Sequence, residues 1–386
     1  MRWQLKIRLS KEPRRMGRRV NMKKLIIFLF SLILCGCSHD MNRREIDEIN
    51  FIHVMSIDYS EGEYVLSAIY SSSQGADPEK GLAGDEESSE GRGATPFEAF
   101  QNLKLKNKKT VSIANTGYFL IGDRAASKGI DVCIDFLSRD ETVKMESLLF
   151  IVKDMRAVDF INESFEKGQN VHEDLEAVEQ KQQELVTRND NTLVNILNAL
   201  ENDITCGLIP YLVADENSFL LQGYAVFDKL ILVDYLDMDT SSGVNFIKNI
   251  IRAYPIYLED NIGLSISYSK SRIKSKLTNN ELKVMIDLSF ETMVKEVNTD
   301  NNIFTEEELN RLTKMQNTYI ENIIKKATNY SIHTGRDILQ IARLMENQHN
   351  KKWSEIEDDW SSMISTIEYE FDIKSQITKS FILGSR

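Results

Sequence analysis

The hydrophobic pattern alternates between short strand-like runs and helix-like stripes along most of the chain. Two apolar runs, residues 51–58 and 64–70, flank Glu61-Gly62 and predict a hairpin. Residues 262–277 and 282–297 alternate between apolar and polar side chains, which predicts long antiparallel strands with one wet face. Further strands are predicted over 118–122, 147–152, 208–213, 220–228, 230–236 and 365–374.

Helix signals lie between these strands. Thr95, Pro96 and Glu98 occupy the N-cap, first and third positions of a helix, which carries the apolar stripe Phe97, Phe100, Leu103 and Leu105. Thr305 is the predicted N-cap of a long amphipathic helix that extends to about residue 327. Other helices are predicted over 125–137, 156–161, 192–200, 239–250 and 337–348.

Two local features modify this picture. Residues 71–93 are rich in Gly, Ser and acidic residues with almost no large apolar side chain, so they predict a mobile surface loop. Pro210 lacks a backbone N–H, which predicts that the strand over 208–213 lies at a sheet edge.

The pattern as a whole predicts an α+β protein of several domains, with mostly antiparallel or mixed sheets that each pack with helices. It shows antiparallel hairpins and no regular βαβ alternation. We expect an N-terminal α+β domain over 37–190 that contains the loop 71–93. A small middle α+β domain over 191–261 and a C-terminal α+β domain with long helices over 262–386 follow.

The segment from Met22 to Gly36 has the features of a cleaved export signal. Two lysines precede an apolar run, residues 25–34, that is too short to cross a bilayer. The ending Leu34-Cys35-Gly36-Cys37 resembles a bacterial lipobox. The resemblance implies cleavage between Gly36 and Cys37, lipidation of the Cys37 sulfur, and a body tethered to the outer face of the cytoplasmic membrane.

Residues 1–21 are interpreted as an extension that does not belong to the natural protein. They hold eight basic residues and one acid. A nucleic-acid arm or a twin-arginine signal region would have similar composition, but a good signal start follows at Met22. We therefore exclude this stretch from the fold.

Charge excludes one class of partner. The chain has 47 Lys and Arg and 59 Asp and Glu, of which ten and one respectively precede Cys37, so the remainder carries 37 against 58 and a formal charge of −21. Such a body repels phosphate backbones, so nucleic-acid binding is not expected. Cys133 and Cys206 are predicted to be buried, unpaired thiols.

The sequence shows no catalytic or metal-binding motif, so no enzyme activity and no cofactor or metal is expected. The histidines are far apart in sequence, and none has metal-ligand spacing with another: His39, His53, His172, His333 and His349. Asp358-Asp359 and the lysine run 104–109 are interpreted as solvated faces. Gly122-Asp123 and Arg139-Asp140 are possible partner contacts, for which structural roles are favoured.

Several of these residues together resemble the Ger(x)C spore germination lipoproteins. The resemblance rests on the lipobox cysteine, Arg43-Arg44-Glu45-Ile46, a strand ending at Ile57-Asp58, and Thr95-Pro96 with Glu98-Ala99. It continues through the motifs Phe119–Gly122, Gly129-Ile130, Asp135–Asp140, the helix start at Gly243, Asp337–Leu339, Lys352-Trp353 and Trp360. Ser38-His39 departs from the family, which usually has Trp after the lipidated cysteine.

The resemblance implies a non-enzymatic C subunit of a nutrient germinant receptor. It would be anchored by lipid on the spore inner membrane and assemble with an A subunit and a transporter-like B subunit. Whether such a subunit contacts the small-molecule germinant is left open. The alternative is a lipid-anchored nutrient- or solute-binding protein, which would need a pocket between doubly wound lobes.

Overall fold

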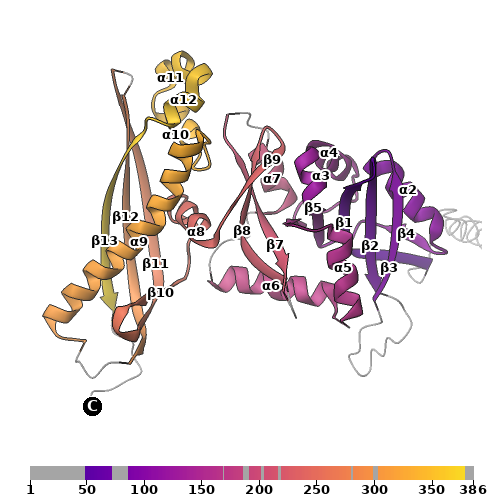
Figure 1. Cartoon of the computed structure of the whole chain (residues 1–386), viewed down its shortest axis with the longest axis horizontal. Coiled ribbons are helices and arrows are strands. Elements are labelled where there is room, and N and C mark those ends of the chain that lie inside the picture. The colour runs from indigo at the N-terminus through magenta and orange to yellow at the C-terminus, as the bar shows by residue number, and fades with distance from the viewer. Residues whose placement is uncertain are drawn as a thin grey trace, which may run out of the picture. The chain divides into compact units, whose positions relative to one another are not determined.

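The computed structural model describes residues 48–71, 86–167, 169–185, 191–200, 204–215, 219–279, 281–298 and 303–378. Within these ranges the strands form two sheets that both pack with helices (Figure 1). The predicted α+β class with mixed sheets is therefore confirmed. In the described ranges no helix is long and apolar enough to cross a membrane.

Among the residues that the structure describes, the first sheet has nine strands in the order β3-β2-β1-β5-β6-β7-β8-β9, and β4 pairs beside β1. Their bounds are β1 Ile49–Ser60, β2 Glu63–Ser71, β3 Glu86–Gly93, β4 Thr110–Ser112, β5 Tyr118–Gly122, β6 Leu148–Val152, β7 Gly207–Ala214, β8 Phe219–Asp228 and β9 Ile231–Leu236. β1, β5, β6 and β7 run parallel, with antiparallel strands on both sides. The carboxyl ends of the parallel strands therefore meet at one edge.

Helices connect the parallel strands. α3 (Asp123–Lys128) and α4 (Asp131–Arg139) lie between β5 and β6, and three helices lie between β6 and β7: α5 Ala157–Glu166, α6 Val171–Leu185 and α7 Leu193–Leu200. The expectation of no βαβ alternation is wrong for this sheet. β5 and β6 have five residues each and are buried throughout, so their sequences carry no periodicity that distinguishes parallel from antiparallel pairing.

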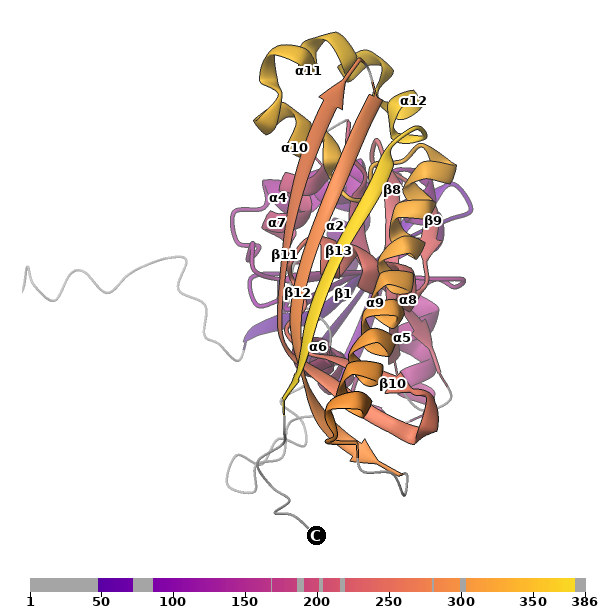
Figure 2. The same ribbon diagram turned by 90° about the vertical axis from the view of Figure 1, so that its left-hand side faces the viewer.

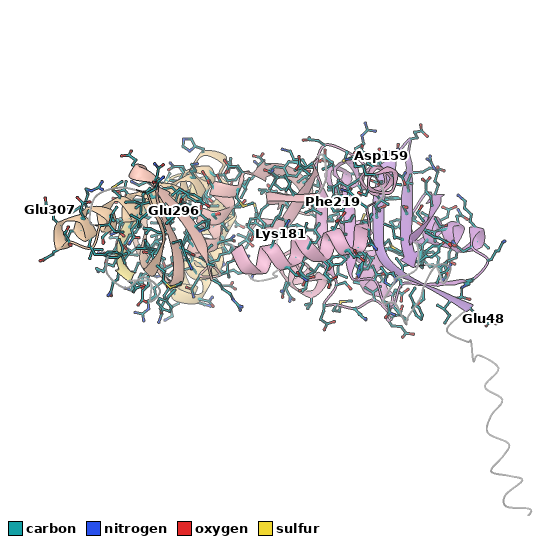
Figure 3. The ribbon with its side chains drawn as sticks, turned by 90° about the horizontal axis from the view of Figure 1, so that it is seen from below. Glu48, Asp159, Lys181, Phe219, Glu296 and Glu307 are labelled. Atoms are coloured by element: carbon teal, nitrogen blue, oxygen red, sulfur yellow. The ribbon has the colours of Figure 1, made fainter. Side chains whose placement is uncertain are left out.

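The helices cover both faces of the first sheet. α2 (Pro96–Lys106), α3, α4 and α7 pack on the core cluster that contains Phe119, whereas α5 and α6 pack on the opposite cluster. In that second cluster Phe160 stacks on Phe219 with ring centroids 4.0 Å apart. Seen from below, α6 with Lys181 lies across the strands near Phe219 (Figure 3).

The predicted capping of α2 is confirmed, but its predicted apolar stripe is partly wrong. The Thr95 hydroxyl accepts a hydrogen bond from the Glu98 amide at 3.1 Å. Phe100 and Leu103 are buried, whereas Phe97 and Leu105 are 62% and 83% exposed. Ala99 lies on the buried face instead, at the point where the backbone of α2 passes close to Gly91 of β3.

The predicted loop 71–93 ends in a strand, so that part of the prediction is wrong. β3 pairs antiparallel with β2 along its length and forms the outer strand of the sheet. Its polar residues suit an exposed edge. Gly91 allows α2 to pack closely on β3, since a Cβ at this position would lie 2.1 Å from the Ala99 carbonyl oxygen. Residues 72–85 of the predicted loop lie outside the described ranges.

Pro210 does not mark an edge strand, because β7 pairs with β8 on one side and with β6 on the other. The pairing with β6 covers only Tyr211 and Leu212. Beside the earlier part of β6, Asn191 replaces β7: its carbonyl accepts from the Leu149 amide at 3.0 Å. The amide missing at Pro210 therefore costs no hydrogen bond to β6.

The second sheet has the order β10-β11-β12-β13. Its strands are β10 Tyr254–Leu258, β11 Ile262–Thr278, β12 Glu281–Val297 and β13 Glu368–Thr378. β11 and β12 form the predicted long hairpin, and β13 runs parallel to β12. Val284, Ile286 and Leu288 are buried while Met285 and Ser289 are exposed, so the predicted wet face is confirmed.

The α-helices in the described part of the C-terminal half are α8 Met238–Ile247, α9 Glu306–Thr334, α10 Ile341–Gln348, α11 Asn350–Ile356 and α12 Trp360–Ile364. α9 runs along the second sheet (Figure 2) and has Thr305 as its N-cap, as predicted, but it continues to Thr334. Gly243 lies inside α8 rather than at its start. A Cβ at Gly243 would lie 2.4 Å from the Ile323 carbonyl oxygen, so this glycine permits close packing of α8 on α9.

The proposed domain boundaries stay predictions. The pairing of β6 with β7 crosses the boundary at 190/191, and the pairing of β10 with β11 crosses the boundary at 261/262. Cys133 and Cys206 are buried free thiols, as predicted.

Candidate functional site

The predicted lipidation site lies before the described part of the chain. Gly36 and Cys37 both precede residue 48, so cleavage and lipidation stay predictions. The candidate site within the folded body must therefore be sought elsewhere.

A cleft of about 610 Å³ lies at the carboxyl ends of β1, β5 and β6. Ser60 ends β1, Asp123 follows β5, and Asp154 follows β6. The other lining residues are Arg124, Met155, Arg156, Asp159 and Glu163. Ligands of α/β sheets bind beyond the carboxyl ends of their strands, so this edge is the candidate functional site.

Asp58 lies behind the cleft and ties β1 to α5. Its carboxylate is 1% exposed and accepts hydrogen bonds from the amides of Ala157 at 2.7 Å and Val158 at 2.8 Å. These are orphan donors of the first turn of α5. Burial raises the pKa of Asp58 to about 6, although both hydrogen bonds and the nearby Arg156 favour the charged form.

Asp123 and Tyr235 join the cleft to the antiparallel part of the sheet. The Tyr235 hydroxyl donates to Asp123 Oδ1 at 2.7 Å, and burial together with this carboxylate raises the pKa of the phenol. The Lys153 ammonium lies 4.9 Å from the Tyr235 ring centroid. Of the Gly122-Asp123 pair, Asp123 therefore lines the cleft and is held by a structural hydrogen bond, whereas Gly122 is buried.

Arg156 and Asp159 form a two-bond ion pair in the same cleft. Arg156 Nε and Nη2 donate to the Asp159 carboxylate at 2.7 and 2.5 Å. Both residues lie at the start of α5, where Asp159 can be seen in Figure 3. The pair neutralises one of the four acids that line the cleft.

The cleft is lined mainly by charged side chains. Its eight lining residues include the Ser60 hydroxyl, four carboxylates and two guanidiniums. These groups can recognise the charges of a small polar molecule or of a partner's side chains.

A second buried aspartate organises the C-terminal half. Asp337 accepts from the Ile341 amide at 2.8 Å, from the Ala342 amide at 2.7 Å and from Trp360 Nε1 at 3.2 Å. This capping explains why α10 begins at Ile341 and not at residue 337 as predicted. Burial raises the pKa of Asp337. Asp337 thus has a structural role, as Asp58 does.

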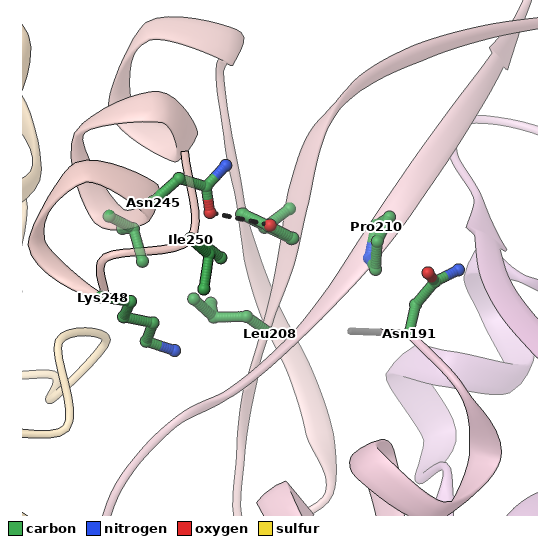
Figure 4. Close-up of a pocket in the computed structure, with 8 residues that line it drawn as sticks. Asn191, Leu208, Pro210, Asn245, Lys248 and Ile250 are labelled. Atoms are coloured by element: carbon green, nitrogen blue, oxygen red, sulfur yellow. Dashed lines mark hydrogen bonds between the residues drawn. The ribbon is translucent and has the colours of Figure 1, made fainter. Parts of the chain in front are cut away.

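A small cavity near α8 is excluded as a ligand site. Leu208, Lys248 and Ile250 help to line it, and the Tyr224 hydroxyl donates to Asn245 Oδ1 at 2.9 Å (Figure 4). Its volume of about 50 Å³ has room for a water molecule but not for a nutrient.

The other residues singled out from sequence have exposed, local contacts. Arg139 pairs with Asp135 and not with Asp140, since its Nε lies 2.7 Å from both carboxylate oxygens of Asp135. Asp358 and Asp359 are exposed in a short 3₁₀ turn. In the lysine run, Lys106 donates to the Glu90 carbonyl oxygen at 2.8 Å.

Sequence spacing missed one pair of residues altogether. His53 and His172 are distant in the chain, yet their ring centroids lie 5.3 Å apart. No group of three or more His, Cys, Asp or Glu side chains in the described ranges is arranged to hold a metal ion.

Comparison with known proteins identifies the family. A family model described as "Spore germination protein N-terminal domain" matches residues 42–214, and one described as "Spore germination B3/GerAC like, C-terminal" matches residues 222–380. The spore germination protein GerQC of Bacillus cereus is 20% identical over 369 residues, covering 93% of this chain and 99% of that protein.

A solved structure shares the fold. The crystal structure of the GerBC protein matches with a TM-score of 0.55 at 15% identity, covering 84% of this chain and 96% of that one. Because the two family models together span nearly all of the chain after residue 41, the chain belongs to the Ger(x)C family of spore germination proteins.

Proposed function

We propose that this chain is a lipid-anchored, non-enzymatic subunit of a nutrient germinant receptor that acts by assembly with membrane-embedded A and B subunits. The observation that carries the proposal is that the lipobox-like Leu34-Cys35-Gly36-Cys37 immediately precedes a body matched by both germination-family models. Anchoring at Cys37 would hold the body beside membrane partners and raise its effective concentration there.

The site supports a binding role over an enzymatic one. The cleft offers charged groups at the edge of the sheet. The buried Asp58 behind it caps α5, and the half-buried Asp159 pairs with Arg156. Such groups recognise a partner without a chemical step. The charge of the body is strongly negative, so retention at an anionic membrane depends on the lipid and the partner subunits.

The test replaces Cys37 with Ala in the gene started at Met22 of a spore former. We expect loss of the lipid mass, of membrane retention, of co-purification with the A and B subunits and of nutrient-triggered germination, while non-nutrient triggers still act. The matched control, Ser38→Ala, should behave as wild type. A Cys37→Ala variant that lacks lipid yet germinates normally with nutrients would overturn the role of anchoring.

A solute-binding protein is the second candidate function. The observation that favours it is the cleft of about 610 Å³ at the carboxyl ends of three parallel strands, an arrangement that the sequence pattern did not predict. Calorimetric titration of the full chain with amino acids, sugars and nucleosides tests this function. Saturable binding that Arg124→Ala abolishes would support it, and the absence of heat with all three classes would refute it.

A further inference from the structure

The later part of β11 is an open edge of the second sheet. β10 pairs with β11 over Ile262–Ile266, and within the described sheet β12 is the one strand that pairs with the residues after this range (Figure 2). A cavity of about 690 Å³ lies along this edge and is lined there by Ser271 and Ile273. Asn249, just after α8, and Arg343 of α10 line the same cavity. An unpaired strand edge of this kind can pair with a strand of another chain.

Side chains cover the edge on both sides of Ile273 but leave Ile273 itself open. The Ser271 amide donates to Asn249 Oδ1 at 2.9 Å, and the Ser275 amide donates to Gln348 Oε1 at 3.0 Å. Both amides therefore point toward the open edge. Because backbone direction alternates from residue to residue in an antiparallel strand, the N–H and C=O of Ile273 point the same way. No side chain of the described residues covers them, so they are available to a further strand.

The exposed face of this edge strand carries a row of cations at every second position: Lys270, Arg272, Lys274 and Lys276. Lys274 pairs with Asp287 of β12 at 2.8 Å. The register, however, places Lys276 opposite another lysine, Lys283. The row therefore holds more positive charge than β12 neutralises, although the body as a whole is strongly acidic. Acids on a strand beside β11 would supply the missing partners.

The opposite edge of the sheet shows this kind of neutralisation. Lys283 Nζ lies 2.8 Å from the Glu368 carboxylate and 3.8 Å from that of Glu370. The two acids occupy alternate positions on β13, which pairs with β12. A strand that pairs with β11 needs the same spacing of acids to match the basic row.

The cavity adds a second requirement, because an added strand turns every other side chain toward it. Its lining includes the apolar side chains of Ile250, Leu339 and Leu344. It also includes two cations, Lys248 and Arg343, and no acid. Apolar side chains on the inner face of an added strand would contact the apolar part of this lining.

We propose that the open edge of β11 binds an extended segment of a partner protein in which acidic and apolar residues alternate. The segment adds a strand to the second sheet and pairs with the backbone of Ile273. Its acids lie beside Lys270 and Arg272, and its apolar side chains fill the cavity next to Leu344. This surface shares no residue with the lining of the cleft at Asp123 and does not depend on lipid at Cys37, so the proposal goes beyond the function given above.

The test measures fluorescence anisotropy of a labelled synthetic peptide of about nine residues, in which Glu and Val alternate, with the full-length chain in detergent. We expect saturable binding of one peptide per chain that weakens as salt is added. The same peptide with Lys in place of Glu should not bind. A peptide with all Glu before all Val should bind at least about tenfold more weakly, because its charges cannot follow the pleat. Equal binding of the alternating and block peptides would overturn the proposal.

Protein variants locate the peptide on the edge. Ile273→Pro removes the outward N–H and leaves the pairing with β12 in place, so it should raise the Kd about tenfold. Arg272→Gln should raise it by up to about fivefold. Lys374→Gln is the matched control: Lys374 is exposed on β13 and pairs with Asp372 of the same strand, so the Kd should not change.

A second substitution covers the case in which Ile273→Pro does not fold. Arg343→Glu places an acid in the cavity lining and should also raise the Kd about tenfold. No saturable binding of the alternating peptide by the wild type would overturn the proposal. An unchanged Kd in folded Ile273→Pro or in Arg343→Glu would do the same.

Discussion

Gly122 leaves the space that the Asp58 carboxylate occupies: a Cβ at Gly122 would lie 2.0 Å from Asp58 Oδ1. The buried Asp58 carboxylate from β1 fills the space that a side chain at residue 122 would need. The last residue of β5 is therefore a glycine. The contact positions the edge of the sheet from which the cleft is built.

Replacing Gly122 with Ala should destabilise the protein by about 3 kcal/mol, because the added methyl group displaces Asp58 from the two amides of α5. Urea unfolding measures the change in the free energy of unfolding. Gly117→Ala is the matched control at the other end of β5, where the nearest atom to a new Cβ is 3.9 Å away. That variant should stay within about 1 kcal/mol of wild type. Equal effects of the two variants would contradict the Asp58 account.

Asp58 should make stability depend on pH in the direction opposite to a usual ion-paired acid. Its pKa is about 6 in the folded protein, against 3.8 for an unperturbed aspartate. The folded state therefore binds the proton more tightly, and stability from this group rises as pH falls from about 7 to about 4, by up to about 3 kcal/mol.

The Asp58→Asn variant, which cannot titrate, isolates this contribution. Its deficit in unfolding free energy relative to wild type should widen as pH falls from 7 to 4. Urea unfolding of both proteins across that range measures the deficit. A deficit that narrows on acidification would mean that the two amide hydrogen bonds outweigh burial.

Trp360→Phe should lower the free energy of unfolding by about 1–3 kcal/mol, because it removes the indole donor to the buried Asp337 carboxylate while keeping an aromatic ring. Trp353→Phe is the comparison. The two indole rings pack edge to face at 5.2 Å, so both variants lose similar aromatic contact. Chemical denaturation should show the larger loss for Trp360→Phe, and the reverse order would argue against Asp337 as the anchor of α10.

Phe100→Ala and Phe97→Ala test which face of α2 is buried. Phe100 is 3% exposed, so Phe100→Ala should lower the free energy of unfolding by about 3–5 kcal/mol. Phe97 is 62% exposed, so Phe97→Ala should change it by less than about 0.5 kcal/mol. Thermal and urea unfolding would detect the difference. Comparable losses at both positions would mean that Phe97 is covered in the folded protein.

Local signals predicted much of the fold. The Thr95 and Thr305 caps and the alternation of β12 are properties of a few adjacent residues, so the sequence shows them directly. The parallel order of β1, β5 and β6 is not local, since five-residue buried strands look alike in either direction. The sequence predicts a loop where β3 lies, because α2 supplies the apolar surface that the residues of β3 lack.

The site was harder to predict than the fold. The sequence marks Gly122-Asp123 as a pair but gives no sign of the Asp123 partner Tyr235, which is 112 residues away in the chain. It does not bring His53 and His172 together, because spacing in sequence says nothing about distance in space. It shows Asp58 only as a strand end, since the α5 amides that it caps are about 100 residues away.

The hydrogen bonds of Asp58 also set an order on how the chain folds. Their donors, the amides of Ala157 and Val158, follow it by 99 and 100 residues. During synthesis from the N-terminus, β1 therefore emerges long before its helix partner, and the Asp58 carboxylate must stay hydrated until α5 arrives. This edge of the sheet can therefore close only after about 100 further residues have been made.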